Sequence, residues 1–358
     1  MIPLTPKEVV IRIARHVLGE SRVYDYLIKR GIELRHLQDG YTDDCGDEGP
    51  CRDEELCKNR AGAPKQQLIF MADGKWMHGG LTDRLRGMTS AYKFAKEHNL
   101  EFKIFHVSPI QLQDILLPNK VNWIIDEKEI IRNKNRAKPV LLYREDFENN
   151  SALERQLDAN HEQFHLYSCI DTVGEKFPEY FNELFKPAPI LQKELVHYGE
   201  LLGTNCVSYS FRFQNKLGDF KEFTFKELTA DGKRELLNAA LGMLRDSGSE
   251  HGMTQQGKNE HGMTQQGNKI LVTADSPTFL AEAAKLPNVV TVKGESIHID
   301  FNSSKKASDY LKSFTEFFLI SRAKKAKLYR NKKYKTYPSN FPKYAALLGH
   351  VPYEVIED

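Results

Sequence analysis

Mainly apolar runs alternate with amphipathic stretches along most of the chain. Residues 67–72 (QLIFMA) have the pattern of a short buried strand. In residues 81–99 the apolar positions recur three and four apart, which predicts a helix, and residues 101–107 predict a second strand. A strand, a helix and a strand in this order form a β-α-β unit, the building block of a parallel sheet covered by helices.

The same alternation continues through both halves of the chain. Further strands of the first half are expected at 121–126, 139–144 and 161–170. A helical stretch at 177–202, interrupted by Pro187 and Pro189, is expected to lead into a second domain. The second half is expected to hold strands at 205–214, 269–275 and 289–294 and helices at 232–247, 276–286, 308–323 and 337–349.

The pattern predicts an α/β protein with two doubly wound, Rossmann-like domains that face each other across a cleft. The expected parts are a helical segment with a Cys- and Asp-rich arm (1–66), an N-terminal Rossmann-like domain (67–195) and a C-terminal one (196–358). Ligands of doubly wound sheets bind outside the carboxyl ends of the strands. We therefore expect the site in the cleft.

Composition narrows the classes of function. Of the 358 residues, 51 are basic and 49 acidic, and a net charge of +2 does not favour a general nucleic-acid binder. No apolar run reaches the roughly 18 residues of a membrane-spanning helix. The amino-terminal apolar part carries charges throughout, unlike a signal peptide. Residues 5–18 have the spacing of a basic amphipathic helix, which either packs in the protein or lies on a membrane surface.

Cys45, Cys51 and Cys57 are six residues apart, whereas zinc sites usually contain tighter pairs. We interpret them as free thiols in a reducing compartment, with a metal site as the alternative.

Two other segments allow more than one interpretation. Residues 250–259 are repeated almost unchanged at 260–269, which we interpret as a tolerated loop expansion, although His251 and His261 could bind a metal. The basic run at 322–335 is either a solvated surface or an anion-attracting one.

Two adjacent glycines, Gly79 and Gly80, precede the first long helix, for which Thr82 is a plausible N-cap. A helix N-terminus offers partial positive charge and free N–H groups to a phosphate, and Arg84 and Arg86 add charge nearby. Neither the Rossmann dinucleotide motif nor the Walker A motif is present. Tight packing of strand on helix is the alternative explanation for the glycines.

Polar residues also mark the ends of strands in the second half. Arg212 lies at such an end, where a guanidinium can clamp a diphosphate with two parallel hydrogen bonds, or simply lie on the surface. Asp275 and Ser276 follow another strand, and Asp275 is either an N-cap or an acceptor for a base or ribose. Ser339 begins the last helix, where its hydroxyl either caps the helix or holds a phosphate oxygen.

In their order, these stretches resemble the fucosyltransferase-like superfamily of GT-B glycosyltransferases, of the bacterial polysaccharide-biosynthesis type. SFRFQNKLGD is similar to the motif His-x-Arg-Arg-Gly-Asp, with Arg212 as the phosphate-binding arginine and Gly218-Asp219 at its end. In this chain the leading His is Ser210, the second Arg is Phe213, and four residues separate Phe213 from Gly218.

Three more stretches carry the resemblance. Asp275-Ser276 correspond to the end of the second motif. Ser339-Asn340-Phe341 correspond to Ser-x-Phe-Ser, with a proline in place of the last Ser. GGLTDRLRG is similar to the family's glycine-rich start, with Asp83 near the position of an Asn.

The resemblance implies a GT-B fold, with the acceptor side at 67–195 and the donor side at 196–358. It also implies an inverting, metal-independent transfer of fucose from GDP-fucose to a glycan hydroxyl in surface polysaccharide synthesis, with no cofactor besides the nucleotide sugar. The chain contains no Asp-x-Asp, in agreement with metal independence. The donor-binding residues would be Gly79, Gly80, Arg84, Arg212, Asp275, Ser276, Ser339, Asn340 and Phe341. The catalytic candidates are Arg212, Asp219, Asp83 and His78, with Glu222 as a further base.

Two other functions stay open at this point: a transferase of another nucleotide sugar, and a non-catalytic protein that binds a nucleotide or a sugar. The expected location is the cytoplasm, with peripheral contact at the inner face of the membrane through residues 5–18.

Overall fold

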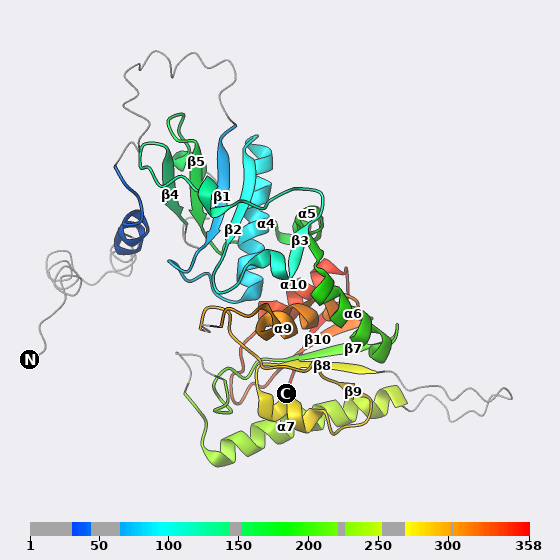
Figure 1. Ribbon diagram of the computed structural model, residues 1–358. Coiled ribbons are helices and arrows are strands. Elements are labelled where there is room, and N and C mark those ends of the chain that lie inside the picture. The colour runs from blue at the N-terminus through cyan, green and yellow to red at the C-terminus, as the bar shows by residue number, and fades with distance from the viewer. Residues whose placement is uncertain (1–30, 44–64, 143–151, 221–225, 253–268, 302–303) are drawn as a thin grey trace, which may run out of the picture. The chain divides into compact units, whose positions relative to one another are not determined.

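The computed structural model describes residues 31–43, 65–142, 152–220, 226–252, 269–301 and 304–358 (Figure 1). The chain divides into two compact units, one of residues 1–78, 91–105 and 124–170 and one of residues 79–90, 106–123 and 171–358. Several sequence-based interpretations fall outside the described residues: those on 5–18, on the three cysteines of the arm, on Glu222 and on most of the repeat at 250–269.

The first unit contains a sheet of four strands in the order β2-β1-β5-β4. The strands are β1 (Gln67–Ala72), β2 (Glu101–His106), β4 (Ala137–Leu141) and β5 (Gln163–Tyr167). β5 pairs in parallel with both β1 and β4. β1 and β2 are joined by α4 (Leu81–Glu97), the helix predicted between them. The segments predicted as strands at 67–72, 101–107 and 161–170 therefore form strands of this sheet.

The second unit contains a parallel sheet of five strands in the order β11-β10-β7-β8-β9. The strands are β7 (Val207–Phe211), β8 (Ile270–Ala274), β9 (Val289–Val290), β10 (Lys325–Arg330) and β11 (Tyr353–Glu357). Because β7 and β8 lie at the centre and are covered on both sides, all ten of their residues are buried.

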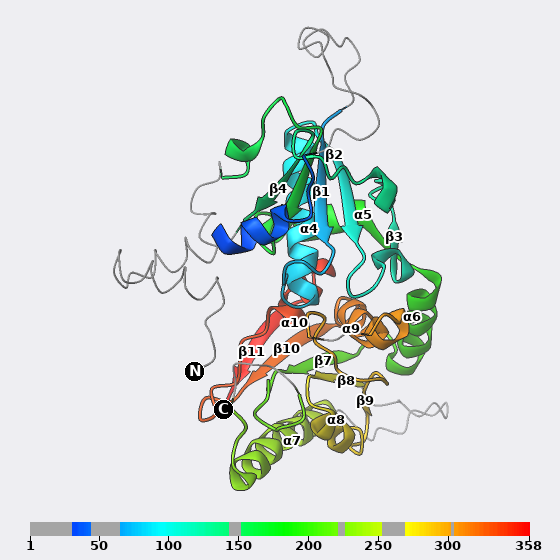
Figure 2. The ribbon, with the colours of Figure 1, turned by 60° about the vertical axis from the view of Figure 1, so that its left-hand side comes forward.

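Helices cover both faces of this second sheet (Figures 1 and 2). On one face lie α7 (Ala230–Gly252) and α8 (Pro277–Ala283), and on the other lie α9 (Ala307–Ile320) and α10 (Asn340–Leu348). Leu236 and Ala240 of α7 and Phe279 of α8 pack on the sheet in one apolar cluster with Val272. The predicted α/β class with doubly wound, Rossmann-like architecture is confirmed.

Three local predictions need correction. The helical stretch at 177–202 is two helices, α5 (Phe177–Leu184) and α6 (Pro189–Leu202), because β6 (Phe185–Pro187) pairs with β3 (Leu116–Pro118) between them. Residues 121–126 make only an isolated bridge at Ile124. The basic run at 322–335 contains a strand, β10, in which Lys327 lies opposite Glu354 and Arg330 lies opposite Glu357 of β11.

Candidate functional site

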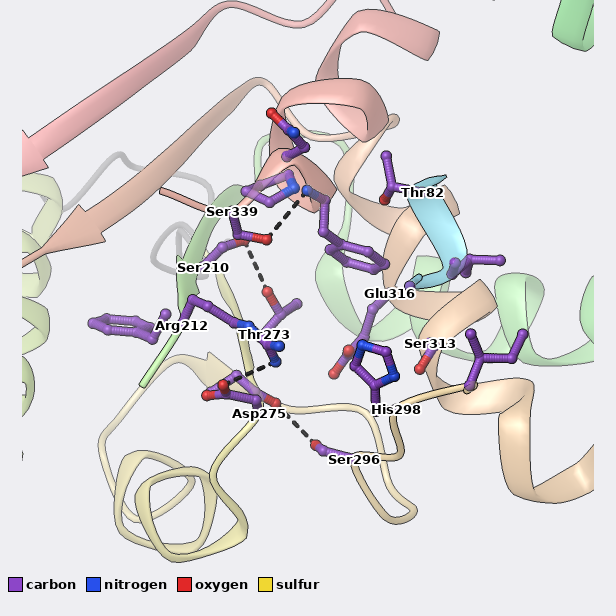
Figure 3. A pocket seen from close by; sticks show the side chains of 18 of the residues that line it. Thr82, Ser210, Arg212, Thr273, Asp275, Ser296, His298, Ser313, Glu316 and Ser339 are labelled. Carbon is purple, nitrogen blue, oxygen red and sulfur yellow. Dashed lines mark hydrogen bonds and ion pairs between the residues drawn. The ribbon is translucent and has the colours of Figure 1, made fainter. Parts of the chain in front are cut away.

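A cavity of about 360 Å³ opens at the carboxyl ends of β7 and β8, and all of its lining residues belong to the second unit. Its walls come from the segment 296–299, from α9, from the start of α10 and from residues 80–83 at the start of α4 (Figure 3). The position agrees with the rule that ligands of doubly wound sheets bind beyond the carboxyl ends of the strands.

Arg212 and Asp275 meet at this edge because each follows directly on one of two adjacent parallel strands. The Arg212 guanidinium donates to Asp275 Oδ2 over 2.9 Å, and the ring of Phe220 lies 4.9 Å from the guanidinium carbon. Asp275 also accepts the backbone N–H groups of Phe213 (2.9 Å) and Gln214 (2.7 Å). Burial raises the pKa of Asp275 to about 6, although Arg212 and these N–H groups oppose the shift. The result is an arginine fixed at the pocket by a buried carboxylate.

The start of α10 forms a second wall. Ser339 is its N-cap, as predicted, and its hydroxyl oxygen accepts the N–H of Phe341 over 3.2 Å. Asn340 and Phe341 line the cavity beside it. Because Ser339 engages the N–H of Phe341 and Pro342 has none, the N-terminus of this helix presents the N–H of Asn340 and a partial positive charge where Arg212 adds a full charge.

Glu316 of α9 brings a carboxylate to the pocket. It forms an ion pair with Lys312 one turn earlier, and both side chains are less than a tenth exposed. Burial raises the pKa of Glu316, while Lys312 opposes the shift. The pocket therefore combines an arginine on one wall with a carboxylate on another (Figure 3).

The start of α4 contributes Gly80, Thr82 and Asp83 to the lining. Asp83 accepts the N–H of Gly80 over 3.0 Å and forms an ion pair with Arg86. The helix begins at Leu81, so Thr82 is its second residue and not its N-cap. Thr82 is only 5% exposed, and among the described residues its hydroxyl has no hydrogen-bond partner.

Seven of the residues predicted for the site line this one cavity: Gly80, Asp83, Arg212, Asp275, Ser339, Asn340 and Phe341. The other five, His78, Gly79, Arg84, Asp219 and Ser276, are not among its lining residues.

Gly79 and Arg84 are both engaged by Asp300. The Gly79 N–H and one Arg84 nitrogen donate to the two oxygens of this carboxylate. A second Arg84 nitrogen lies 3.1 Å from His106 Nε2 and from the carbonyl of Ser108. The Arg84–Asp300 pair is almost fully buried, so it ties the segment after the 296–299 wall to the start of α4.

Asp219, Ser276 and His78 have structural contacts. Ser276 is the N-cap of α8, in place of Asp275, and accepts the N–H of Phe279. The Ser276 hydroxyl donates to Asp219 over 2.6 Å, and the N–H of Thr278 donates to the same carboxylate oxygen. His78 belongs to the first unit, where its Nδ1 lies 3.2 Å from the carbonyl oxygen of Ser168.

Sequence reasoning missed Glu316, His298 and the lining role of Thr82. Glu316 interrupts an apolar stretch, FTEFFLI, four residues after a lysine, and a charge inside such a stripe is a usable signal. His298 lies in a segment without periodicity, so only the tertiary structure brings it to the pocket. In the part of the chain that the structure describes, no group of three or more His, Cys, Asp or Glu residues is placed to hold a metal ion.

The parallel sheets, the covering helices and a pocket at the strand ends define the fold class: two Rossmann-like units of the GT-B type. Solved fucosyltransferase structures share this fold. The α-1,6-fucosyltransferase NodZ from Bradyrhizobium, in crystals soaked with GDP-fucose, matches with a TM-score of 0.50 and 14% identity over 82% of this chain and 95% of that chain. NodZ co-crystallised with GDP gives the same values.

A point mutant of Arabidopsis thaliana FUT1 in complex with GDP matches with a TM-score of 0.51 and 9% identity, over 98% of this chain and 78% of that chain. No protein-family model and no curated protein sequence matches the chain. Because the sequence identities are only 9–14%, these matches show a shared fold. The resemblance predicted from the motifs is confirmed for the fold.

Proposed function

We propose that the chain is an inverting, metal-independent glycosyltransferase that moves fucose from GDP-fucose to a glycan hydroxyl. The fold is that of NodZ and FUT1, whose structures hold GDP-fucose or GDP. The observation that carries the proposal is the pocket itself, where Arg212 and the N-terminus of α10 line one cavity.

Both groups suit a diphosphate leaving group. In the proposed reaction an acceptor oxygen bonds to the anomeric carbon of fucose while the bond from that carbon to the β-phosphate oxygen breaks, and GDP leaves with the electron pair. A guanidinium donates in parallel to phosphate oxygens, and the start of α10 adds the N–H of Asn340 and the partial positive charge of the helix. Aiming donors at a charge that grows in the transition state contributes roughly 3 kcal/mol, or about a hundredfold in rate, per donor.

We propose that Asp83 is the base that takes the proton of the acceptor hydroxyl. Among the four catalytic candidates named from the sequence, only Asp83 and Arg212 line the cavity, and Asp83 is the carboxylate of the two. Its side chain is 35% exposed, so a hydroxyl can reach it. Proton transfer to such a positioned group typically contributes about 10² to 10⁴ in rate.

We propose that the Glu316 carboxylate binds the nucleobase. Guanine carries an imino N–H and an amino group side by side, and a carboxylate can accept from both. Lys312 opposes the pKa rise that burial imposes on Glu316 and so favours its ionised form. A uracil or cytosine base lacks this pair of donors.

The first test is a nucleotide panel. Thermal shifts with GDP, UDP, dTDP and CMP should show the largest rise for GDP, since a ligand that binds only the folded state raises its apparent stability. A preference for UDP or dTDP would indicate a transferase of another nucleotide sugar.

The second test is turnover. Release of GDP from GDP-fucose, with water or a glycan as acceptor, should be measurable in the parent chain and lost in R212A. Binding without any turnover would indicate the non-catalytic alternative.

The remaining assignments are also proposals. The acceptor is a hydroxyl of a surface polysaccharide, and the protein works in the cytoplasm with peripheral membrane contact through residues 5–18. In the described residues, no helix is both long and apolar enough to cross a bilayer. Co-sedimentation with anionic vesicles, compared with a chain lacking residues 1–20, tests the membrane contact.

A further inference from the structure

Thr82 has a buried hydroxyl without a hydrogen-bond partner among the described residues. Its side chain lines the pocket, is 5% exposed, and makes no hydrogen bond within the described residues. Burying a hydroxyl without a partner costs free energy. Two other hydroxyls of the lining, those of Ser210 and Thr273, pair with each other over 2.8 Å.

The helix does not need this hydroxyl. Gly80 and Gly79, which precede α4, already donate their N–H groups to Asp83 and Asp300. A threonine inside a helix commonly bonds back to a carbonyl of the preceding turn, as Thr89 of the same helix does to Leu85 over 2.9 Å. Thr82 does not cap the helix, and among the described residues its hydroxyl makes no such bond to a carbonyl. In Figure 3 its oxygen turns toward the other lining side chains.

The chemistry of the site indicates what the partner is. A threonine hydroxyl both donates and accepts, which suits another hydroxyl. In the proposed function, Arg212 and α10 bind the diphosphate and Asp83 takes the proton of the acceptor, so the transferred sugar lies between them. Thr82 precedes Asp83 on the same helix start and lines the same cavity.

We propose that Thr82 hydrogen-bonds a hydroxyl of the transferred sugar and thereby contributes to donor specificity. This inference rests on the proposed function. Its consequence is that the hydroxyl should matter for GDP-fucose and not for GDP.

The test compares T82V with the parent chain. Valine keeps the shape of threonine and removes only the unpaired hydroxyl, so folding should be retained. We expect T82V to lower both GDP-fucose affinity and kcat/KM for GDP-fucose about tenfold, and to leave GDP affinity within twofold, both affinities measured by calorimetry. T82S, which keeps the hydroxyl, should restore most of the loss.

Thr315 provides a matched control. It is also a buried threonine whose hydroxyl has no partner among the described residues, but it does not line the cavity. T315V should therefore leave both GDP-fucose and GDP binding unchanged.

Three outcomes overturn the inference. If T82V handles GDP-fucose like the parent chain, the hydroxyl has no sugar partner. If GDP affinity falls as much as GDP-fucose affinity, the contact is to the nucleotide. If the parent chain binds neither GDP nor GDP-fucose, the proposed function fails and the inference fails with it.

Discussion

Asp275 is the most constrained side chain of the pocket. It is buried, and it already accepts from Arg212, Phe213 and Gln214. Three protein donors leave such a carboxylate little capacity for a ribose or a base, the role considered from sequence. We therefore interpret Asp275 as a positioning residue that orients Arg212 toward a diphosphate.

A double-mutant cycle on GDP affinity tests this interpretation. R212A should weaken GDP about 30-fold, because hydrogen bonds to charged groups contribute about 2 kcal/mol, and D275N about tenfold. Since Asp275 acts through Arg212, the double mutant should bind GDP no more than threefold weaker than R212A alone. Additive effects would mean that Asp275 contacts the nucleotide directly.

D300N is the control for this cycle, because it breaks another buried Arg–Asp pair of the second unit. Its effect on GDP affinity should add to that of R212A.

A second buried polar site lies in the first unit around His165. The Gln163 oxygen accepts the N–H of Ile131, so it also accepts from His165 Nε2, and the Tyr41 hydroxyl donates to His165 Nδ1. The ring is thus held neutral, and burial lowers its pKa to about 3. The pKa of His106, in the second unit, is also lowered to about 3, mainly by burial and secondly by the charge of Arg84.

These histidines should make the protein sensitive to acid. Each has a folded pKa of about 3, whereas a histidine in the unfolded chain has its ordinary pKa of about 6.5, so the unfolded chain binds more protons between these limits. Stability is therefore retained above pH 6.5 and lost as the pH falls toward 3, by about 1.4 kcal/mol per pH unit for each histidine. The pKa of Asp275 is raised from 3.8 to about 6, so between these two pH values Asp275 changes the stability in the opposite direction.

Urea unfolding between pH 6 and 4 measures this slope. H165Q should be less stable at pH 7 but should lose less stability on acidification, with a slope lower by up to about 1.4 kcal/mol per pH unit. An unchanged slope would show that His165 is charged in the folded protein.

At the scale of elements, glycines decide how closely helices approach. Gly349 follows α10, and a Cβ there would lie 1.7 Å from the backbone oxygen of Ser321, which follows α9. This close approach sets how α10 packs beside α9, and therefore where Ser339 and Asn340 lie. The opening of α4 is tight as well, because Gly79 has a φ of +85° and a Cβ would meet the Asp83 carboxylate.

Gly349→Ala should therefore destabilise the protein by about 3 kcal/mol, as overpacking against a backbone atom does. The matched control is Gly242→Ala within α7, where a Cβ would meet nothing within 4 Å. That change should stabilise by about 0.5–1 kcal/mol. Equal unfolding free energies for the two variants would contradict this account.

At the scale of the molecule, charge is almost balanced, with 51 basic and 49 acidic residues. Much of the basic run at 322–335 is neutralised locally, since Lys325 and Lys327 pair with Glu354, and Arg330 with Glu357. The charge offered to a diphosphate is thus concentrated at Arg212 and the start of α10.

We therefore expect turnover of GDP-fucose to be unchanged by an excess of EDTA, and unchanged on adding Mg²⁺ or Mn²⁺. Loss of turnover on chelation, restored by one of these ions, would show that a metal ion and not Arg212 stabilises the charge of the leaving diphosphate.

Much of the architecture could be read from periodicity. Apolar patterns predict the buried strands QLIFMA and KILVTAD, and the apolar positions three and four residues apart predict the helix α4. Each of these patterns fits the side-chain period of only one kind of backbone. β10 was missed since its alternation, Lys-Ala-Lys-Leu, resembles a charged surface until Glu354 and Glu357 of β11 lie opposite it.

The sequence alone determined the alternation of strands and helices, most strands of the two sheets and the polar residues at strand ends, because these depend on local pattern. Only the tertiary structure decided which of those residues share a cavity. Arg84 and Arg212 have the same chemistry, yet Asp300 engages the first in a buried pair while the second lines the pocket. The difference depends on contacts between segments distant in sequence, which no local pattern records.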